Sequence, residues 1–217
     1  MIGTDSLFDL SSPVSSAFRS SLLGPISLIT APSGAVLTTA EAKAQCKVDI
    51  SDDDTLIDSL VSASTAFCEQ EIYGHRQFLT ATYDVPVACW WEGLLKLPRP
   101  PLASVTHVKY YDTNGTQQTL ASTYYTVRTP WKQPGSVERA PDQTFPNVQS
   151  DRRYPITIRL VAGYGAASAV PPLAKQAMLM LVGHWYRNRE SVVTGSISKE
   201  IENGVRAILE SEGYGSY

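Results

Sequence analysis

The hydrophobic pattern of this chain changes its period twice along the sequence, and this limits the folds open to it. Between residues 54 and 72 apolar side chains recur every three or four positions, and the same spacing returns after Pro171. Between residues 78 and 161 apolar and polar residues alternate in short runs rich in Thr, Tyr and Val. The first spacing is typical of amphipathic helices and the second of half-buried strands. We therefore expect an α+β fold, in which a small antiparallel β region is inserted into a helical-bundle body.

Local signals mark the first two helices. Thr38 stands three residues before Glu41, as in a capping box, and predicts a short helix over residues 39–46. The acidic residues 52–54 suit the positive end of a second helix, and Gly74 would end it.

Two consecutive prolines begin a long third helix, because proline is well placed in a first helical turn. A shorter helix is expected near residues 198–210. The stripe expected to be buried on the long helix consists of Leu173, Ala177, Met180, Leu181, His184 and Trp185.

The β region is expected to hold five or six short strands. Asn114-Gly115 lies between two alternating runs and predicts a hairpin, because both residues tolerate a positive φ. Residues 129–153 are rich in Pro and polar side chains and are expected to form a loop before a last strand at 156–161.

The N-terminal stretch has a different composition, with frequent Ser at first and then scattered Gly and Pro, and predicts an extended arm. The expected parts are the N-terminal arm (1–36), a first helical part (37–76), the β insertion (77–162), a second helical part with the long helix (163–190), and a C-terminal helix and tail (191–217).

Composition narrows the possible functions. The 217 residues are 43% hydrophobic, which is enough for a sizeable core. The net charge of −3 argues against broad electrostatic binding of nucleic acid, which needs many Lys and Arg side chains. No apolar run reaches the roughly 20 residues that span a bilayer, and the start lacks the pattern of a signal peptide. We expect a protein of the cytosol, or of a particle assembled there, without membrane contact.

No catalytic, cofactor or metal site is predicted. The three Cys residues have no zinc-ligand spacing, and the acidic residues 52–54 lack the ligand alternation of a calcium loop. His184 has no acidic partner on its own helix face. Gly163-Tyr164-Gly165 has no phosphate-loop motif around it and indicates a turn between a strand and a helix.

Aromatic residues occur as doublets in the β region. Lys and Arg are sparse around them, so core packing and contacts between subunits are better explanations than stacking on single-stranded nucleic acid. The candidate subunit-interface residues are Trp90, Trp91, Tyr110, Tyr124 and Trp131.

Several segments, in order along the chain, carry a resemblance to one family. The segments are Thr38-Thr39-Ala40-Glu41-Ala42-Lys43 with Val48-Asp49, Leu97-Pro98-Arg99-Pro100-Pro101-Leu102 with Ser104-Val105, Val161-Ala162-Gly163-Tyr164-Gly165 with Val170-Pro171 and Ala177, and His184-Trp185-Tyr186 with Asn188-Arg189-Glu190. Together they resemble the head–tail connector (neck adaptor) proteins of tailed bacteriophages and gene transfer agents.

The resemblance implies a non-enzymatic subunit of the virion neck. Such adaptors form a homo-oligomeric ring, usually of twelve copies, below the portal protein. The ring extends the channel for double-stranded DNA, which passes without sequence-specific binding, and it offers a docking surface to stopper, tail-completion or tail proteins.

In similar proteins the C-terminal helix and tail dock on the portal. The amphipathic end of this chain fits that role. The candidate portal-interface residues are Arg187, Arg189, Ile197, Ile201, Val205, Ile208, Leu209, Tyr214 and Tyr217.

Two other classes of function come into question for this chain. A small hydrolase would need clustered titratable residues, which the sequence does not offer. A cytosolic module that binds a peptide or carbohydrate through its β insertion remains the alternative.

Overall fold

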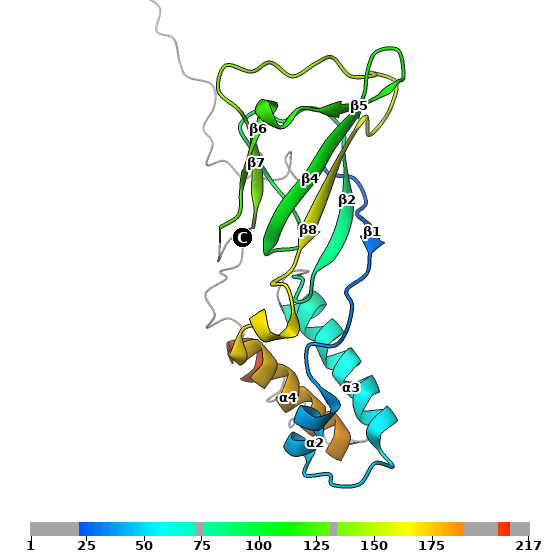
Figure 1. Cartoon of the computed structure of the whole chain (residues 1–217), viewed down its shortest axis with the longest axis vertical. Helices are drawn as coiled ribbons and strands as arrows, with labels where there is room; N and C mark the ends of the chain where they lie inside the picture. The colour runs from blue at the N-terminus through cyan, green and yellow to red at the C-terminus, as the bar shows by residue number, and fades with distance from the viewer. Residues whose placement is uncertain (1–21, 73–75, 131–133, 189–203, 209–217) are drawn as a thin grey trace, which may run out of the picture.

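The computed structural model describes residues 22–72, 76–130, 134–188 and 204–208. The molecule is elongated, with helices at one end and β-sheets at the other (Figure 1). The two ends have separate hydrophobic cores. These two ends are the helical part and the β part of the molecule.

The helical part contains α2 (Thr39–Cys46), α3 (Asp54–Phe67) and α4 (Pro172–Arg187), and all three pack against one another. A π-helical turn, η1 (Cys68–Ile72), extends α3. Ile57 and Val61 of α3 meet Met178 and Leu181 of α4 in the core, and all four are 3% exposed or less.

The capping box predicted before α2 is confirmed. The Oγ1 atom of Thr38 accepts a hydrogen bond from the backbone N–H of Glu41 at 3.2 Å. In return the Oε2 atom of Glu41 accepts one from the backbone N–H of Thr38 at 2.7 Å. The helix then spans the predicted residues 39–46.

The predicted buried stripe of α4 is wrong in part. Ala177 and Leu181 are buried, but Leu173 is 44% exposed. Because α4 packs on both α2 and α3, its buried side is broader than a single stripe and is rotated from the predicted one. The buried α4 residues are Ala174, Ala177, Met178, Leu181, Val182 and Gly183.

The β part consists of two antiparallel sheets. The larger sheet has the strand order β1-β2-β8-β4-β5, formed by β1 (Ser27–Thr30), β2 (Ala81–Val87), β8 (Ile156–Ala162), β4 (Leu102–Tyr111) and β5 (Gln117–Leu120). The smaller sheet has the order β3-β7-β6, formed by β3 (Leu94–Lys96), β7 (Ser136–Arg139) and β6 (Tyr125–Arg128).

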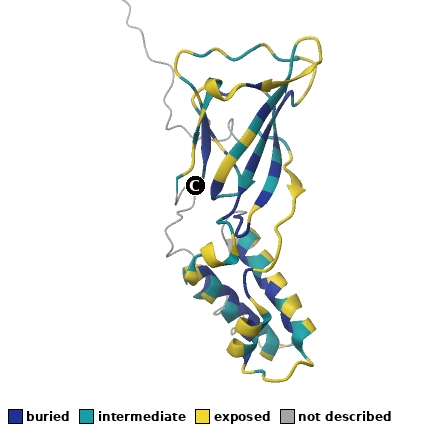
Figure 2. Ribbon diagram, in the orientation of Figure 1, coloured by how far each residue is buried: buried dark blue, intermediate teal, exposed yellow. Residues whose placement is uncertain are grey.

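Alternation determines which face of the larger sheet is buried. Along β2 and β8 every second residue is buried, as the alternating colours of Figure 2 show. Val85 and Ile158 face the core that Leu95 and Val137 of the smaller sheet also enter.

The predicted hairpin at Asn114-Gly115 is confirmed, since it joins the paired strands β4 and β5. Short 3-10 helices, η2 (Ser122–Tyr124) and η3 (Ala167–Ala169), lie before β6 and α4.

The expected helical-bundle body is wrong. The described residues form a mixed α/β structure in which strands predominate, arranged as two antiparallel sheets.

Two strands had no clear sequence signal. All four residues of β1 are exposed, so it lacks the alternation of a half-buried strand. β7 is only four residues long and lies inside the predicted Pro-rich loop.

The described end of the predicted N-terminal arm lies along the edge of the larger sheet. The backbone N–H of Gly24 donates to the carbonyl of Pro86 at 2.7 Å, and that of Ala88 donates to the carbonyl of Leu22 at 2.9 Å. β1 continues this pairing with β2. The chain's own sheet therefore holds the arm from Leu22 onward.

Backbone contacts close the junction between the two parts. The N–H of Tyr164 donates to the carbonyl of Phe78 at 2.8 Å, and that of Thr80 donates to the carbonyl of Gly165 at 3.2 Å. Gly163 has a φ of +114°, and a Cβ atom on it would lie 2.4 Å from the carbonyl oxygen of Leu79. Only glycine allows this close approach.

A polar network lies beside these contacts. The Oε1 atom of Glu69, at the end of the helical part, accepts hydrogen bonds from Gln77 Nε2 at 2.9 Å and from the backbone N–H of Phe78 at 2.8 Å. The hydroxyl of Tyr83 on β2 donates to Gln77 Oε1. Gln77 is only 2% exposed, so these bonds satisfy polar groups that water cannot reach.

Candidate interaction surfaces

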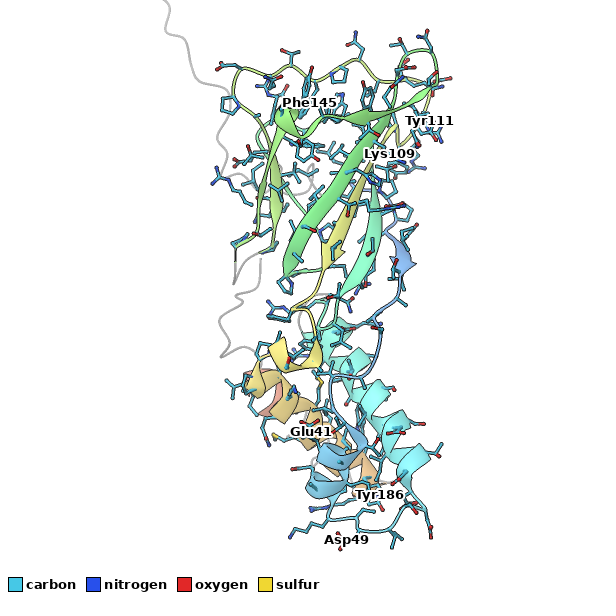
Figure 3. All side chains as sticks on the ribbon, viewed as in Figure 1. Glu41, Asp49, Lys109, Tyr111, Phe145 and Tyr186 are labelled. Carbon is cyan, nitrogen blue, oxygen red and sulfur yellow. The ribbon has the colours of Figure 1, made fainter. Side chains whose placement is uncertain are left out.

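Three of the predicted aromatic residues of the β part form a cluster with Phe145 from the segment that follows β7. Trp90 stacks on Phe145 with ring centroids 4.4 Å apart, and its Nε1 donates to the carbonyl of Pro146 at 2.7 Å. Trp91 and Tyr110 meet Trp90 edge to face at 5.7 and 5.6 Å. Phe145 is labelled in Figure 3 at the end of the molecule away from the helices. These contacts hold the segment around Phe145 and Pro146 against the β part.

These aromatic residues differ in how much surface they offer a partner. Trp91 is 3% exposed and lies within the core of the β part. Trp90, Tyr110 and Tyr124 are half-buried and pack against the same core. Trp131 lies outside the described residues. A role for these residues in subunit contacts stays a prediction.

The structure describes only some of the predicted portal-binding residues. Arg187 is exposed at the end of α4. Val205 is fully buried in the helical core, and Ile208 packs against that core. One face of the segment at residues 204–208 therefore completes the helical part. The others, Arg189, Ile197, Ile201, Leu209, Tyr214 and Tyr217, lie outside the described residues.

The far tip of the helical part is acidic. Asp49 and Asp52 are exposed in the α2–α3 connection, and Ile50 between them is 61% exposed. Figure 3 shows Asp49 at this tip and Tyr186 close by. The hydroxyl of Tyr186 donates to Asp53 at 2.5 Å. This bond ties the end of α4 to the start of α3.

The outer face of the larger sheet carries a cross-strand charged pair. Arg159 on β8 makes two hydrogen bonds to the carboxylate of Asp84 on β2, each 2.7 Å long. His107 on β4 pairs with Arg159 in the sheet register. Burial lowers the pKa of His107, and the charges of Lys109 and Arg159 lower it further. Opposite charges on neighbouring strands stabilise a sheet modestly.

The β1 edge is a surface that the sequence interpretation missed. Ile26, Leu28 and Ile29 are 38%, 53% and 45% exposed. One signal could have revealed it, since no charged residue stands between Arg19 and Glu41. Exposed edge strands are usually protected by charges.

The described part of the chain holds no metal-binding cluster, since no group of three His, Cys, Asp or Glu side chains is placed there to bind a metal ion. Burial raises the pKa of the Cys68 thiol to about 12, so this thiol stays protonated at neutral pH. Within the described ranges no helix has the length and apolar character needed to cross a membrane.

Solved structures of gene transfer agent particles contain similar chains. One from the neck of an empty particle, computed with C6 symmetry, and one from the native virion each match with a TM-score of 0.71 at 20% identity. Each match covers 89% of this chain and 97% of the other. This chain has the fold of a gene transfer agent neck chain. A match to the native neck, computed with C12 symmetry, has a TM-score of 0.69. No protein-family model and no curated protein matches the sequence.

Proposed function

We propose that this chain is a structural adaptor subunit of a virion neck. Copies of it form a ring below the portal protein, and this ring extends the DNA channel and carries the docking surface for stopper or tail proteins. The neck fold, shared over nearly the full length of the matched chains, carries the proposal. The subunit acts by binding rather than by catalysis.

The shape and chemistry of the chain support such a role. A closed ring needs two different sides on each subunit that fit one another. The elongated form offers long sides to neighbours and leaves two distinct ends for other partners (Figure 1). The matched chains come from structures computed with sixfold and twelvefold symmetry, so a ring of twelve is the assembly we propose.

The proposed portal contact lies at the helical end. Arg187 is exposed there, close to where the chain continues to the predicted tail. Val205 is buried, so deletion of the whole C-terminal segment would also open the helical core. A point substitution of Arg187 is therefore a cleaner test of portal binding than a truncation.

The decisive experiment mixes the purified full chain with the portal protein encoded by the same particle genes and images the mixture in negative stain. We expect a ring of this protein on one face of the portal. A chain that stays monomeric and does not bind the portal would contradict the proposal.

A matched pair of variants locates the portal contact. Arg187→Glu should weaken portal binding about tenfold, which corresponds to about 1.4 kcal/mol. Arg139→Glu makes the same charge change on an exposed residue of the β part and should leave portal binding unchanged. Equal effects of the two variants would place the contact elsewhere.

The alternative of a peptide- or carbohydrate-binding module has less support. A shallow depression beside β3 and β7 is lined by Leu94, Lys96 and Arg128, among other residues. Arg128 there is paired with Glu138 at 2.7 Å. Because such sites usually combine an apolar pocket with converging polar groups, this open depression does not favour the alternative.

A further inference from the structure

Two exposed apolar patches lie near the middle of the molecule. The edge patch consists of Ile26, Leu28 and Ile29 on and beside β1. The waist patch consists of Ala166, Ala169, Pro172 and Leu173, in and around η3 and at the start of α4. All of these residues are exposed, and Leu173 is 44% exposed.

Both patches lie in uncharged stretches of the chain. No Asp, Glu, Lys or Arg occurs between Arg19 and Glu41, and none occurs between Arg159 and Lys175. Burying either patch therefore does not take a charged residue of the same stretch of sequence out of water. Such surfaces suit a dry contact with another apolar surface.

The patches lie on opposite sides of the molecule. Figure 1 shows β1 at one side edge and the start of α4, in yellow, at the other, both near the junction of the two parts. Figure 2 shows exposed residues at both places. Two copies placed side by side in the same orientation bring the edge patch of one toward the waist patch of the next.

We propose that the edge patch of one copy docks on the waist patch of the next copy and forms the subunit contact of the ring. This inference rests on the proposed function and specifies the two surfaces that make the ring. A contact between unlike patches is head-to-tail, which is the type that generates closed rings.

A second copy explains these surfaces better than a bound peptide strand. A peptide added to β1 would cover the edge patch alone and leave the waist patch exposed. The register of β1 is also irregular between Leu28 and Thr30, which interrupts a regular hydrogen-bond ladder. Side-chain packing against another copy does not need such a ladder.

Cross-linking tests the contact directly. The full chain carries the exposed Cys89 and the buried Cys46 and Cys68, so Cys89→Ser gives a background without an exposed thiol among the described residues. Into this background go Leu28→Cys and Leu173→Cys, singly and together. A short bifunctional maleimide is then applied to the concentrated protein, with and without portal rings.

The double variant should give a ladder of covalent oligomers larger than a dimer, because every copy carries both halves of the contact. Each single variant should stay a monomer. Leu28→Cys combined with Ile50→Cys is the matched control, since Ile50 is exposed at the far tip and should give no ladder.

Dimers from Leu28→Cys alone would overturn the proposal, because they would mean that two edge patches meet. A ladder of equal strength from the control with Ile50→Cys would overturn it too. Rings seen in images without any ladder would reject this contact and leave the proposed function intact. Absence of oligomers in every sample, portal included, would reject both.

An independent variant gives the same contact a second test. Leu28→Asp should weaken self-association about tenfold. Leu28 is 53% exposed, so the thermal unfolding curve should stay close to that of the unchanged chain. Unchanged assembly of this variant would also overturn the proposal.

Discussion

The helical part and the β part carry opposite charge. Between residues 76 and 162 the chain has ten Lys and Arg residues and six Asp and Glu residues. Residues 31–72 and 163–188, which hold the helices of the helical part, have four basic and eight acidic residues. All subunits of a cyclic ring point the same way, so the two faces of the proposed ring would differ in sign. That difference gives the two ends different electrostatic preferences for partners.

The two parts also differ in how they are held together. The helical part depends on apolar packing among three helices and on a cap before α2. The β part depends on alternating strands and on aromatic contacts at its outer end. Close backbone contacts and a small polar network hold the junction, beside the stacked rings of Phe78 and Tyr164. The junction is therefore where one substitution should affect both parts.

The largest effect is expected at the junction. Gly163→Ala should destabilise the chain by about 3 kcal/mol or more, because the residue has a positive φ and the new methyl group would clash with the carbonyl of Leu79. At roughly 2–4 °C per kcal/mol, the melting temperature should fall by about 10 °C. Differential scanning calorimetry measures this.

Gly165→Ala is the matched control for this substitution. Gly165 has the same φ of +114°, but the nearest atom to its added Cβ is the Cβ of Ala169 at 3.9 Å. This variant should show the cost of backbone strain alone, about 1–3 kcal/mol. If the two variants lose equal stability, the close contact at Gly163 does not hold the junction.

The next effect tests whether residues 204–208 belong to the helical part. Val205→Ala should lower the free energy of unfolding by about 2 kcal/mol, because it removes two buried methyl groups and leaves a cavity. Arg206→Ala, at an exposed neighbour, should change stability by less than about 0.5 kcal/mol. Chemical denaturation of both variants measures the difference. Equal stabilities would mean that this segment does not complete the core.

Features with a local cause were predictable from the sequence. The cap at Thr38, the first helix and the hairpin at Asn114-Gly115 each depend on a few neighbouring residues. Features that depend on distant contacts were not. β1 is a strand only because β2 pairs with it, and its exposed side chains give no alternation.

The candidate surfaces follow the same rule. Sequence reasoning selected Trp90, Trp91 and Tyr110, and the structure brings these three residues together. The sequence could not indicate that Phe145, 35 or more positions further on, would complete their cluster. Nor could periodicity show that Val205 faces the chain's own core, since an amphipathic segment has the same pattern against any apolar surface.

A smaller effect tests the helical part alone. Thr38→Ala removes the side chain that accepts from the backbone N–H of Glu41 and should cost about 1 kcal/mol. Thr38→Ser keeps the accepting oxygen and should lose only a small fraction of that. Far-ultraviolet circular dichroism during urea unfolding compares them. Equal losses would mean that the methyl group of Thr38 matters more than its cap.

The smallest effect is on the pH dependence of stability. It compares a carboxylate at the junction with a carboxylate at the cap of α2. Burial raises the pKa of Glu69 above its ordinary value of 4.5, against opposing effects of the hydrogen bond from Phe78 and the charge of Arg99. The stability that Glu69 contributes is therefore fully present below pH 4.5 and is lost as the pH rises through the raised pKa. Glu69→Gln keeps an oxygen that can accept both hydrogen bonds and removes the buried charge. The variant should melt at the same or a slightly higher temperature at pH 7.

The pKa of Glu41 is shifted in the opposite direction, so its contribution to stability depends on pH with the opposite sign. Hydrogen bonds from Thr38 lower the pKa of Glu41, so its contribution is present above pH 4.5 and is lost as the pH falls through the lowered pKa. Glu41→Gln should therefore melt at a slightly lower temperature at pH 7 and match the unchanged chain at low pH. Melting curves between pH 3 and pH 7 compare the two variants. If both shift in the same direction at pH 7, burial does not dominate at Glu69, and the junction is electrostatically like the exposed cap.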